Sequence, residues 1–525
     1  MASKTLFQSL RGVLAPKADA INEAGGRAYQ RSDKQALAQY AATGCLGATF
    51  YAGAEEQLDA TLKLCQAIEP EFIARTAICA RERGHMKDMP ALLLAVLSVR
   101  SPGLMAEAFD RVIDSPKMLR NFVQIMRSGV VGRKSLGSLP KRLIQQWLET
   151  RNDEQLFIGS IGNAPSLADI LRMVHPKPTS PVREALYGYL IGREHNAEAL
   201  PELVKQYEKF KRNTNPGKVA VPDVPFQMLT ALPLTPKDWR QIARTASWQT
   251  TRMNLNTFQR HGVFEDEEVT AIVANRLRNE RLVASARVLP YQLMVAYMNA
   301  NASVPTSVRE ALQDAMELAL KNVPRVAGKV YVCVDVSGSM HSPVSGQREG
   351  ATTAVRCVDV AALVAAALLR KNPDAEVLPF ESKTVNIRLN PRDSVMTNAS
   401  KLASLPYGGT NCSAPLRTLN ERRAKGDLVV FVSDNESWID SPVHGRFGGS
   451  QTATMNEWSQ FKLRNRNARM VCIDIQPAGT VQAKESLDIV NVGGFSDQVF
   501  ELIANVASGQ HGSDHWVRVI ENVRL

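Results

Sequence analysis

The feature that most constrains the fold of this chain is a change of hydrophobic pattern at Lys329. Before it, apolar residues recur with the spacing of amphipathic helices. After it, short β-branched apolar runs alternate with helical segments, which is typical of strands joined by helices. The 525 residues are enough to bury a core in each part. We therefore predict two domains, one helical and one mixed.

The first domain is predicted to be a succession of short paired helices. Helical spacing is found at residues 36–41, 55–68, 72–83, 89–99, 118–126, 139–148, 181–191, 200–210, 236–246, 265–277, 290–298 and 305–320. Polar turns separate these segments, and no strict sequence period relates them. Such helices favour an α-solenoid or a helical ring. Strand-like stretches are almost absent from this part of the chain.

The second domain is predicted to be a doubly wound α/β sheet. Strand patterns are found at residues 329–336, 375–380, 427–433 and 468–475, and helical patterns at 355–369 and 414–424. The first strand, K-V-Y-V-C-V-D-V, is almost entirely apolar, as expected for a strand buried on both faces of a parallel sheet. Strands that alternate with helices indicate βαβ units. We place the linker between the domains at residues 322–328.

Oxygen-bearing side chains follow the ends of two predicted strands. Asp335, Ser337 and Ser339 follow the first, Asp434 follows the third, and Thr410 lies between them in a glycine-rich loop. In a doubly wound sheet, ligands bind at the carboxyl ends of the strands, so we expect these five side chains to converge there. Hard oxygen donors suit Mg²⁺ or Mn²⁺. The alternative interpretation is a serine-rich turn unrelated to the aspartate and threonine.

The positive charge is concentrated in the first domain. The whole chain has a formal net charge of +11, whereas residues 329–525 have 21 basic and 20 acidic residues. Such an excess suggests a polyanion as partner, most simply a nucleic acid. The alternative is a solvated surface with no partner. Basic clusters stand out at Arg133-Lys134, at Lys141-Arg142 and along a helix with Lys205 and Lys209.

The remaining composition indicates a cytoplasmic protein. The seven cysteines form no C-x-x-C pair, which argues against a zinc site or a disulfide framework. The N-terminus has no apolar core of a signal peptide. The longest apolar run, residues 360–369, is shorter than the roughly 20 residues that span a bilayer. We therefore expect no membrane association.

The pattern D-x-S-x-S after a first strand, with a later threonine and a later aspartate, resembles the metal-ion-dependent adhesion site of von Willebrand factor A domains. Here the pattern is Asp335-Val336-Ser337-Gly338-Ser339, without departure. In adhesive members of that family a partner completes the ion's coordination. The resemblance therefore implies an open coordination position that would capture a carboxylate or a phosphate.

A second resemblance covers nearly the whole chain. Residues 39–45 and 49–51 look like the opening of the TROVE module, and residues 169–178 are similar to its L-L-R-x-x-H-x-K-P segment. Residues 408–415 and 434–436 match the Ro type of A domain. The order of the two modules is that of the Ro autoantigen family, and the chain looks like a bacterial Ro orthologue.

The resemblance implies a domain plan. An N-terminal segment, residues 1–24, would pack on the A domain. Residues 25–322 would form a TROVE RNA-binding domain, a ring of HEAT-like helical repeats. Residues 329–525 would form the A domain, which closes the ring.

The resemblance also implies a function without enzymatic activity. Family members bind Y RNAs, which are small noncoding stem-loop RNAs, on an outer basic surface. They take single-stranded 3′ ends of misfolded or precursor RNAs into a central hole. In bacteria they act as adaptors for exoribonucleases such as polynucleotide phosphorylase, in RNA maturation, decay and stress recovery. We expect a monomer that forms larger assemblies with RNA.

The residues expected to contact RNA lie in the matching motif and in the basic clusters. They are Arg172, His175, Lys177, Arg133, Lys134, Lys141, Arg142, Lys205 and Lys209. Lysine and arginine can neutralise phosphates, and His175 can stack or hydrogen-bond. The alternative for His175 is a helix-end side chain that caps carbonyl groups, and for Lys205 and Lys209 a solvated helix face.

Two other functions compete with RNA binding. One is a protein-adhesion scaffold in which the metal site captures an acidic partner and the helical domain is passive. The other is a metal-dependent phosphoryl-transfer enzyme, which ranks last because the sequence has no P-loop and no H-E-x-x-H motif. No histidine or glutamate is placed as a general base, although Glu436 is close in sequence. We therefore interpret the site as a binding site.

Overall fold

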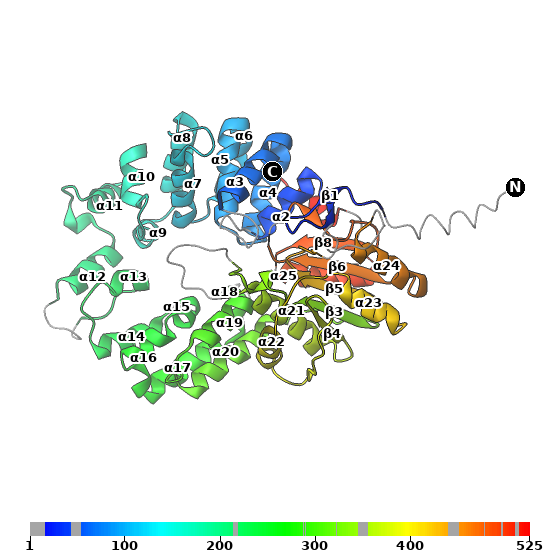
Figure 1. Ribbon diagram of the computed structural model, residues 1–525. Helices are drawn as coiled ribbons and strands as arrows, with labels where there is room; N and C mark the ends of the chain where they lie inside the picture. Colours follow the sequence, from blue (N-terminus) through cyan, green and yellow to red (C-terminus); the bar gives the residue numbers. More distant parts are fainter. Residues whose placement is uncertain are drawn as a thin grey trace. The chain divides into compact units, whose positions relative to one another are not determined.

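The computed structural model describes residues 16–43, 54–213, 219–286, 288, 290–321, 323–344, 355–438, 451–476, 478–494, 497–509 and 514–525. The chain divides into two compact units (Figure 1). Unit 1 comprises the described parts of Met1–Phe72, Leu289–Val295 and Leu320–Arg524. Unit 2 comprises those of Ile73–Val288 and Ala296–Ala319, with Leu525.

Unit 1 is built on a five-stranded parallel sheet. Its strand order is β4-β3-β5-β6-β8, so the chain crosses over between neighbouring strands. The strands are β3 (Val330–Asp335), β4 (Glu376–Phe380), β5 (Leu428–Ser433), β6 (Arg469–Asp474) and β8 (Ile489–Gly493). The four predicted strands and the doubly wound fold are confirmed, whereas β8 was not predicted.

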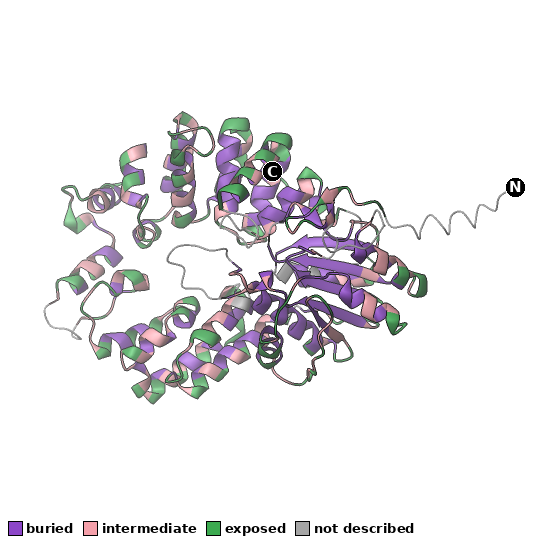
Figure 2. Ribbon diagram, in the orientation of Figure 1, coloured by how far each residue is buried: buried purple, intermediate pink, exposed green. Residues whose placement is uncertain are grey.

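Helices cover both faces of this sheet because successive side chains of a buried strand point to opposite faces. Tyr331, Cys333 and Phe431 belong to an apolar core with side chains of α23 and α24. Helix α21, which is buried along nearly its whole length, packs on β3, β4 and β5 (Figure 2). The helices of this part are α21 (Cys357–Lys371), α22 (Val395–Ala403), α23 (Ala414–Glu421), α24 (Ala453–Arg464), α25 (Asp497–Ser508) and α26 (His515–Glu521).

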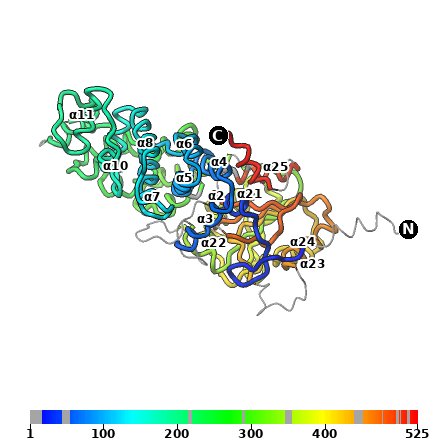
Figure 3. The backbone as a smooth tube through the Cα atoms, turned by 90° about the horizontal axis from the view of Figure 1, so that it is seen from above, coloured from blue at the N-terminus to red at the C-terminus, as the bar shows by residue number. Residues whose placement is uncertain are grey.

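The N-terminal part of unit 1 adds a second small sheet that the sequence did not predict. Strand β1 (Ala20–Ile21) pairs with β2 (Arg27–Gln30), which pairs with β7 (Thr480–Val481). Helix α2 (Asp33–Thr43) follows and packs against β8 and α26, and α3 (Ala54–Ala67) packs on α2 (Figure 3). The predicted domain boundary at residue 25 lies between β1 and β2, which pair with each other, and it stays a prediction.

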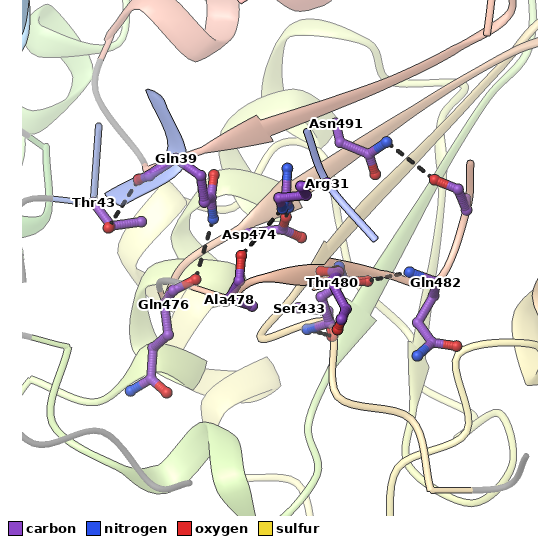
Figure 4. Close-up of polar contacts among 12 residues, drawn as sticks. Arg31, Gln39, Thr43, Ser433, Asp474, Gln476, Ala478, Thr480, Gln482 and Asn491 are labelled. Atoms are coloured by element: carbon purple, nitrogen blue, oxygen red, sulfur yellow. Dashed lines mark hydrogen bonds and ion pairs between the residues drawn. The ribbon is translucent and has the colours of Figure 1, made fainter. Parts of the chain in front are cut away.

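Buried polar side chains attach this N-terminal segment to the parallel sheet. Arg31 forms an ion pair with Asp474 at the end of β6, and its Nε donates to the Ala478 carbonyl oxygen at 3.1 Å (Figure 4). The Gln39 Nε2 donates to the Gln476 carbonyl oxygen at 3.2 Å. These contacts join residues more than 400 positions apart in the sequence.

Unit 2 is helical in all its described residues, apart from turns and loops. Its helices are α4 (Pro70–Glu82), α5 (Asp88–Arg100), α6 (Pro102–Val112), α7 (Pro116–Ser128), α8 (Ser138–Thr150), α9 (Asp153–Ile158), α10 (Leu167–Val174), α11 (Pro181–Ile191), α12 (Glu202–Lys211), α13 (Phe226–Leu229), α14 (Pro236–Thr245), α15 (Trp248–Met253), α16 (Leu255–Arg260), α17 (Glu267–Leu277), α18 (Glu280–Ala286), α19 (Pro290–Asn299) and α20 (Thr306–Ala319), with α4 and α19 crossing the division. The helical repeat-like domain is thus confirmed, and ring closure stays a prediction.

Several helices of unit 2 begin at side-chain caps, and long polar side chains join some of them. Ser115, Ser166 and Ser180 each accept a hydrogen bond from a backbone N–H of the first turn that follows, which satisfies a donor left free at the helix start. At the opposite ends, Arg183 donates to the Leu148 and Arg151 carbonyl oxygens, both at 2.6 Å. Such bonds satisfy carbonyl groups that have no partner within their own helix.

Candidate metal centre and basic surface

The five predicted metal ligands lie in loops at the carboxyl end of the parallel sheet of unit 1. Strand β3 ends at Asp335, neighbouring strand β5 ends just before Asp434, and Thr410 precedes α23. All five predicted ligands are buried, with at most 4% of their surface exposed. Burial of two carboxylates and three hydroxyls at one sheet end is unusual, because polar groups lose hydration there.

Hydrogen bonds connect the loops that carry these side chains. The Asp335 Oδ1 accepts from the Ser337 backbone N–H at 2.9 Å, and the Ser337 and Ser339 hydroxyl oxygens are 3.3 Å apart. The Ser433 hydroxyl, which precedes Asp434, donates to the Asp335 Oδ2 at 2.6 Å. The aspartates and serines therefore come together, as the sequence predicted.

The threonine loop is attached to the same place through backbone bonds. The Gly338 N–H donates to the Gly408 carbonyl oxygen at 3.0 Å, and the Trp438 N–H donates to the Thr410 carbonyl oxygen at 3.3 Å. The loop with Thr410 thus bridges the loops that follow β3 and β5. A side chain at Gly408 would meet the Glu381 carboxylate and displace it.

Burial makes this carboxylate group electrostatically unfavourable without a cation. Burial raises the pKa of Asp434 to about 7, and the charge of Asp335 adds to this effect. Burial likewise raises the pKa of Asp335. The Asp434 Oδ2 has no hydrogen-bond partner among the described residues. A hard divalent cation would supply both the missing charge and the missing partner, so the residues fit Mg²⁺ or Mn²⁺.

Glu436 is a further member of this acidic group that the sequence prediction left out. It is 2% exposed, and its Oε1 has no hydrogen-bond partner in the described chain. Burial raises its pKa to about 9, with further contributions from the charges of Asp434 and Glu23. The run Asp434-Asn435-Glu436 after a buried strand could have indicated a second acidic residue at the site, but the sequence does not show that Glu436 is buried.

No cluster of three or more histidine, cysteine, aspartate or glutamate side chains that could hold a metal ion is found among the described residues. This agrees with a ligand set in which hydroxyl groups outnumber carboxylates. Such a set favours hard cations over zinc, which prefers nitrogen and sulfur ligands.

In unit 2 the structure brings the Lys141-Arg142 cluster beside residues of the matching motif. Lys141 and Arg142 lie near the start of α8, and Gln145 follows one turn later on the same face. The Gln145 Nε2 donates to the Val174 carbonyl oxygen at 2.6 Å and to that of His175 at 3.4 Å. The end of α10 is thereby placed beside the start of α8. We call the exposed residues Lys141, Arg142, His175 and Lys177 the basic surface.

The side chains of the basic surface are available to a ligand. His175 ends α10 in the left-handed conformation, with φ of 51°. Its imidazole makes no hydrogen bond or ion pair with a described residue, so it does not cap carbonyl groups there. No ion pair of Lys141, Arg142 or Lys177 is found within the described ranges. The same holds for Lys134 and Lys209, which are also exposed.

Three other predicted RNA contacts are already engaged within the protein. Arg172 donates to the Ile191 carbonyl oxygen at 2.7 Å and pairs with Asp169. Arg133 donates to the Ser98 carbonyl oxygen at 2.9 Å, and Lys205 to that of Glu198 at 2.7 Å. These cations bind carbonyl groups at or near helix ends, so part of the positive charge of unit 2 serves the fold.

Comparisons with known proteins agree with this architecture. Residues 329–507 match the family model described as the Ro60 vWA domain. The curated "RNA-binding protein RO60" of Deinococcus radiodurans is 23% identical over 97% of this chain and 100% of its own length. This relative matches along nearly the whole of both chains, as the resemblance to the Ro family predicts. The Ro resemblance is confirmed.

Two further matches extend the comparison with Ro proteins. The "RNA-binding protein RO60" of Caenorhabditis elegans is 24% identical over 47% of this chain and 40% of its own length. The crystal structure of the Deinococcus radiodurans RO (RSR) protein matches with a TM-score of 0.60 and 21% identity, over 91% of this chain and 100% of that one. This structural likeness supports the fold described above. Within the described residues, no helix is long and apolar enough to cross a membrane.

Proposed function

We propose that this Ro-type chain binds RNA through the basic surface of unit 2. The observation that carries the proposal is the assembly of Lys141, Arg142, His175 and Lys177 beside one another through the Gln145 bonds to the end of α10. The relatives named RNA-binding proteins support the choice of RNA among polyanions. Exposed cations that form no ion pair within the protein contribute most to the affinity for phosphates, since they lose no existing ion pair when RNA binds.

The finer proposal follows the Ro resemblance. The chain would bind Y-like small RNAs on the basic surface and single-stranded 3′ ends of misfolded or precursor RNAs in a ring formed by residues 25–322 and closed by residues 329–525. It would act in the cytoplasm, without catalysis of its own, as a monomer and an adaptor for an exoribonuclease such as polynucleotide phosphorylase. Residues 1–24 would pack on the A domain; for the described part of this segment, the bonds of Asn22 to Ser437 and of Lys484 to Asp19 support the proposal.

We further propose that Asp335, Ser337, Ser339, Thr410 and Asp434 bind Mg²⁺ or Mn²⁺. The unpartnered, buried Asp434 Oδ2 supports this proposal. Five protein oxygens leave at least one position of an octahedral cation for an anionic group or water.

The RNA proposal is tested by charge reversal with a matched control. In the test variant Lys141, Arg142 and Lys177 are changed to Glu. In the control variant Lys237, Arg260 and Arg281, three exposed cations elsewhere in unit 2, are changed to Glu. Affinity for a structured RNA with a 3′ tail is measured over a range of salt concentrations. We expect the test variant to lose most of its affinity and salt dependence, because both come from phosphate contacts.

Equal losses in the two variants would show only a dependence on net charge and would contradict the basic surface. Binding of an acidic protein partner that depends on Asp335, together with no RNA binding by the intact chain, would favour the adhesion scaffold instead.

A further inference from the structure

Tyr407 is an exposed aromatic side chain next to the proposed metal ligands. It is 65% exposed and lies in the loop that carries Thr410. A Cβ atom added to Gly338 would be 3.8 Å from the Tyr407 Cδ2, so the ring borders the turn between Ser337 and Ser339. The ring therefore lies at the entrance to the buried oxygen ligands while most of its surface faces solvent.

The position of this ring is held by a chain of contacts. The His341 and Tyr407 ring centroids are 4.4 Å apart, with planes inclined by 45°. The His341 Nδ1 is 2.9 Å from the Arg356 Nη1, and it accepts that hydrogen bond because a guanidinium group only donates. Arg356 is in turn paired with Asp359 of α21 at 2.7 Å. The imidazole that supports Tyr407 is thus fixed to a buried helix.

Polar groups and a second aromatic ring lie near Tyr407. The His341 imidazole contacts its ring, the Glu381 carboxylate lies beside Gly408, and the Trp438 ring lies beside Gly409. A flat ring that is 65% exposed is suited to stacking with a planar ligand. Nucleic-acid bases of any type stack on such rings.

We propose that this end of the sheet is a nucleotide-binding site, in which the cation binds a phosphate group and the base stacks on Tyr407. The inference rests on the proposed metal site but not on the basic surface of unit 2. Without a cation, the buried carboxylates of Asp335 and Asp434 would repel a phosphate. With one, a phosphate supplies both the negative charge and the oxygen ligand that an open coordination position requires.

The first test uses three small ligands with the full-length protein. Binding of radiolabelled AMP, ribose 5-phosphate and adenosine is measured by equilibrium dialysis with Mg²⁺ or with EDTA. We expect AMP to bind only with Mg²⁺, and ribose 5-phosphate to bind about 5- to 100-fold more weakly because it has no base to stack. Equal binding of AMP and ribose 5-phosphate would overturn the proposal.

The second test changes the ring. Tyr407→Ala is expected to reduce AMP affinity to that of ribose 5-phosphate, and Tyr407→Phe to retain it. Leu487→Ala, at another exposed side chain of unit 1, is the matched control and is expected to bind AMP normally. Undiminished AMP binding by Tyr407→Ala would refute the role of the ring, whatever the result for the metal.

Two further measurements separate the sources of the ligand and the causes of failure. If a 5′-phosphorylated triadenylate displaces labelled AMP more strongly than unlabelled AMP does, the ligand of this site is the 5′ end of an RNA strand. Equal competition would identify a free nucleotide, and both results support the site. A rise in thermal stability with Mg²⁺ but no AMP binding would overturn this inference alone. No effect of Mg²⁺ at all would also overturn the metal proposal.

Discussion

Arg31 and Asp474 form a buried ion pair that joins the N-terminal hairpin to the end of strand β6. Their side chains are 5% and 1% exposed. Loss of one partner would leave an uncompensated charge in the interior. We therefore expect Arg31→Ala to reduce the free energy of unfolding by about 3–5 kcal/mol, measured by urea denaturation of the unit 1 transition.

A matched control for this pair is the surface ion pair of Arg422 and Glu376, whose side chains are 45% and 35% exposed. Arg422→Ala should cost about 1 kcal/mol or less. Replacement of both Arg31 and Asp474 by apolar residues should recover much of the loss. A cost for Arg31→Ala no larger than that of the control would show that the hairpin is not held by this pair.

The stability of the metal-free protein should fall as the pH rises. The pKa of Asp434 is raised to about 7 and that of Glu436 to about 9, mainly by burial. The folded state therefore favours the protonated carboxyl groups, and their contribution is complete below the unfolded pKa values of about 4. It is lost between pH 4 and these raised values. In EDTA the melting temperature should decline over this range, and Mg²⁺ should reverse the decline above pH 7. A decline of equal size with Mg²⁺ would contradict the metal site.

Asp434→Asn should separate metal binding from folding. The amide keeps the shape of the side chain but removes a charge that is buried beside Asp335. We expect the Mg²⁺-dependent rise in melting temperature to disappear, while the metal-free variant at pH 8 is at least as stable as the unchanged protein. Asp393→Asn, at a half-buried carboxylate that pairs with Lys401, should retain the response to Mg²⁺. A variant that still responds fully would remove Asp434 from the ligand set.

His175→Gly should make the protein more stable but a weaker binder of RNA. His175 has φ of 51°, a conformation that costs a non-glycine residue roughly 1 kcal/mol. Its imidazole has no partner among the described side chains to lose. Arg423→Gly, at an exposed position of unit 1 with the same φ, is expected to give a similar gain without affecting RNA. Unchanged RNA affinity for His175→Gly would exclude the imidazole from the binding surface.

Gln145→Leu should weaken RNA binding without changing its salt dependence. The amide positions the end of α10 but carries no charge, so its loss removes no phosphate contact. Lys141→Ala removes one such contact and should lower the slope of log affinity against log salt by about 0.7–0.9. Gln146→Leu, at the next position of α8, is a suitable control. A lower salt slope for Gln145→Leu would contradict a purely positioning role.

Several parts of this protein could be predicted from local sequence patterns. Strands β3 and β5 are continuous apolar runs, and such runs can be stable only inside a sheet covered on both faces. Asp335, Ser337, Ser339 and Asp434 follow directly from those runs, because parallel strands place their carboxyl ends at one edge. The small sheet of β1, β2 and β7 could not be predicted in this way, since β1 and β7 have only two residues each and are too short to show a pattern.

The sequence by itself determined the two kinds of domain, the oxygen-bearing side chains at the sheet edge and the location of the positive charge, because hydrophobic period and residue type are local properties. Only the tertiary structure decided which cations remain available. Lys141 and Arg133 look alike in the sequence, yet one is exposed without an ion pair in the described chain and the other binds the Ser98 carbonyl oxygen. It also decided that Arg31 meets Asp474 and that Glu436 turns inward. Such contacts depend on how distant segments pack, and the sequence of one segment does not indicate which other segment it will contact.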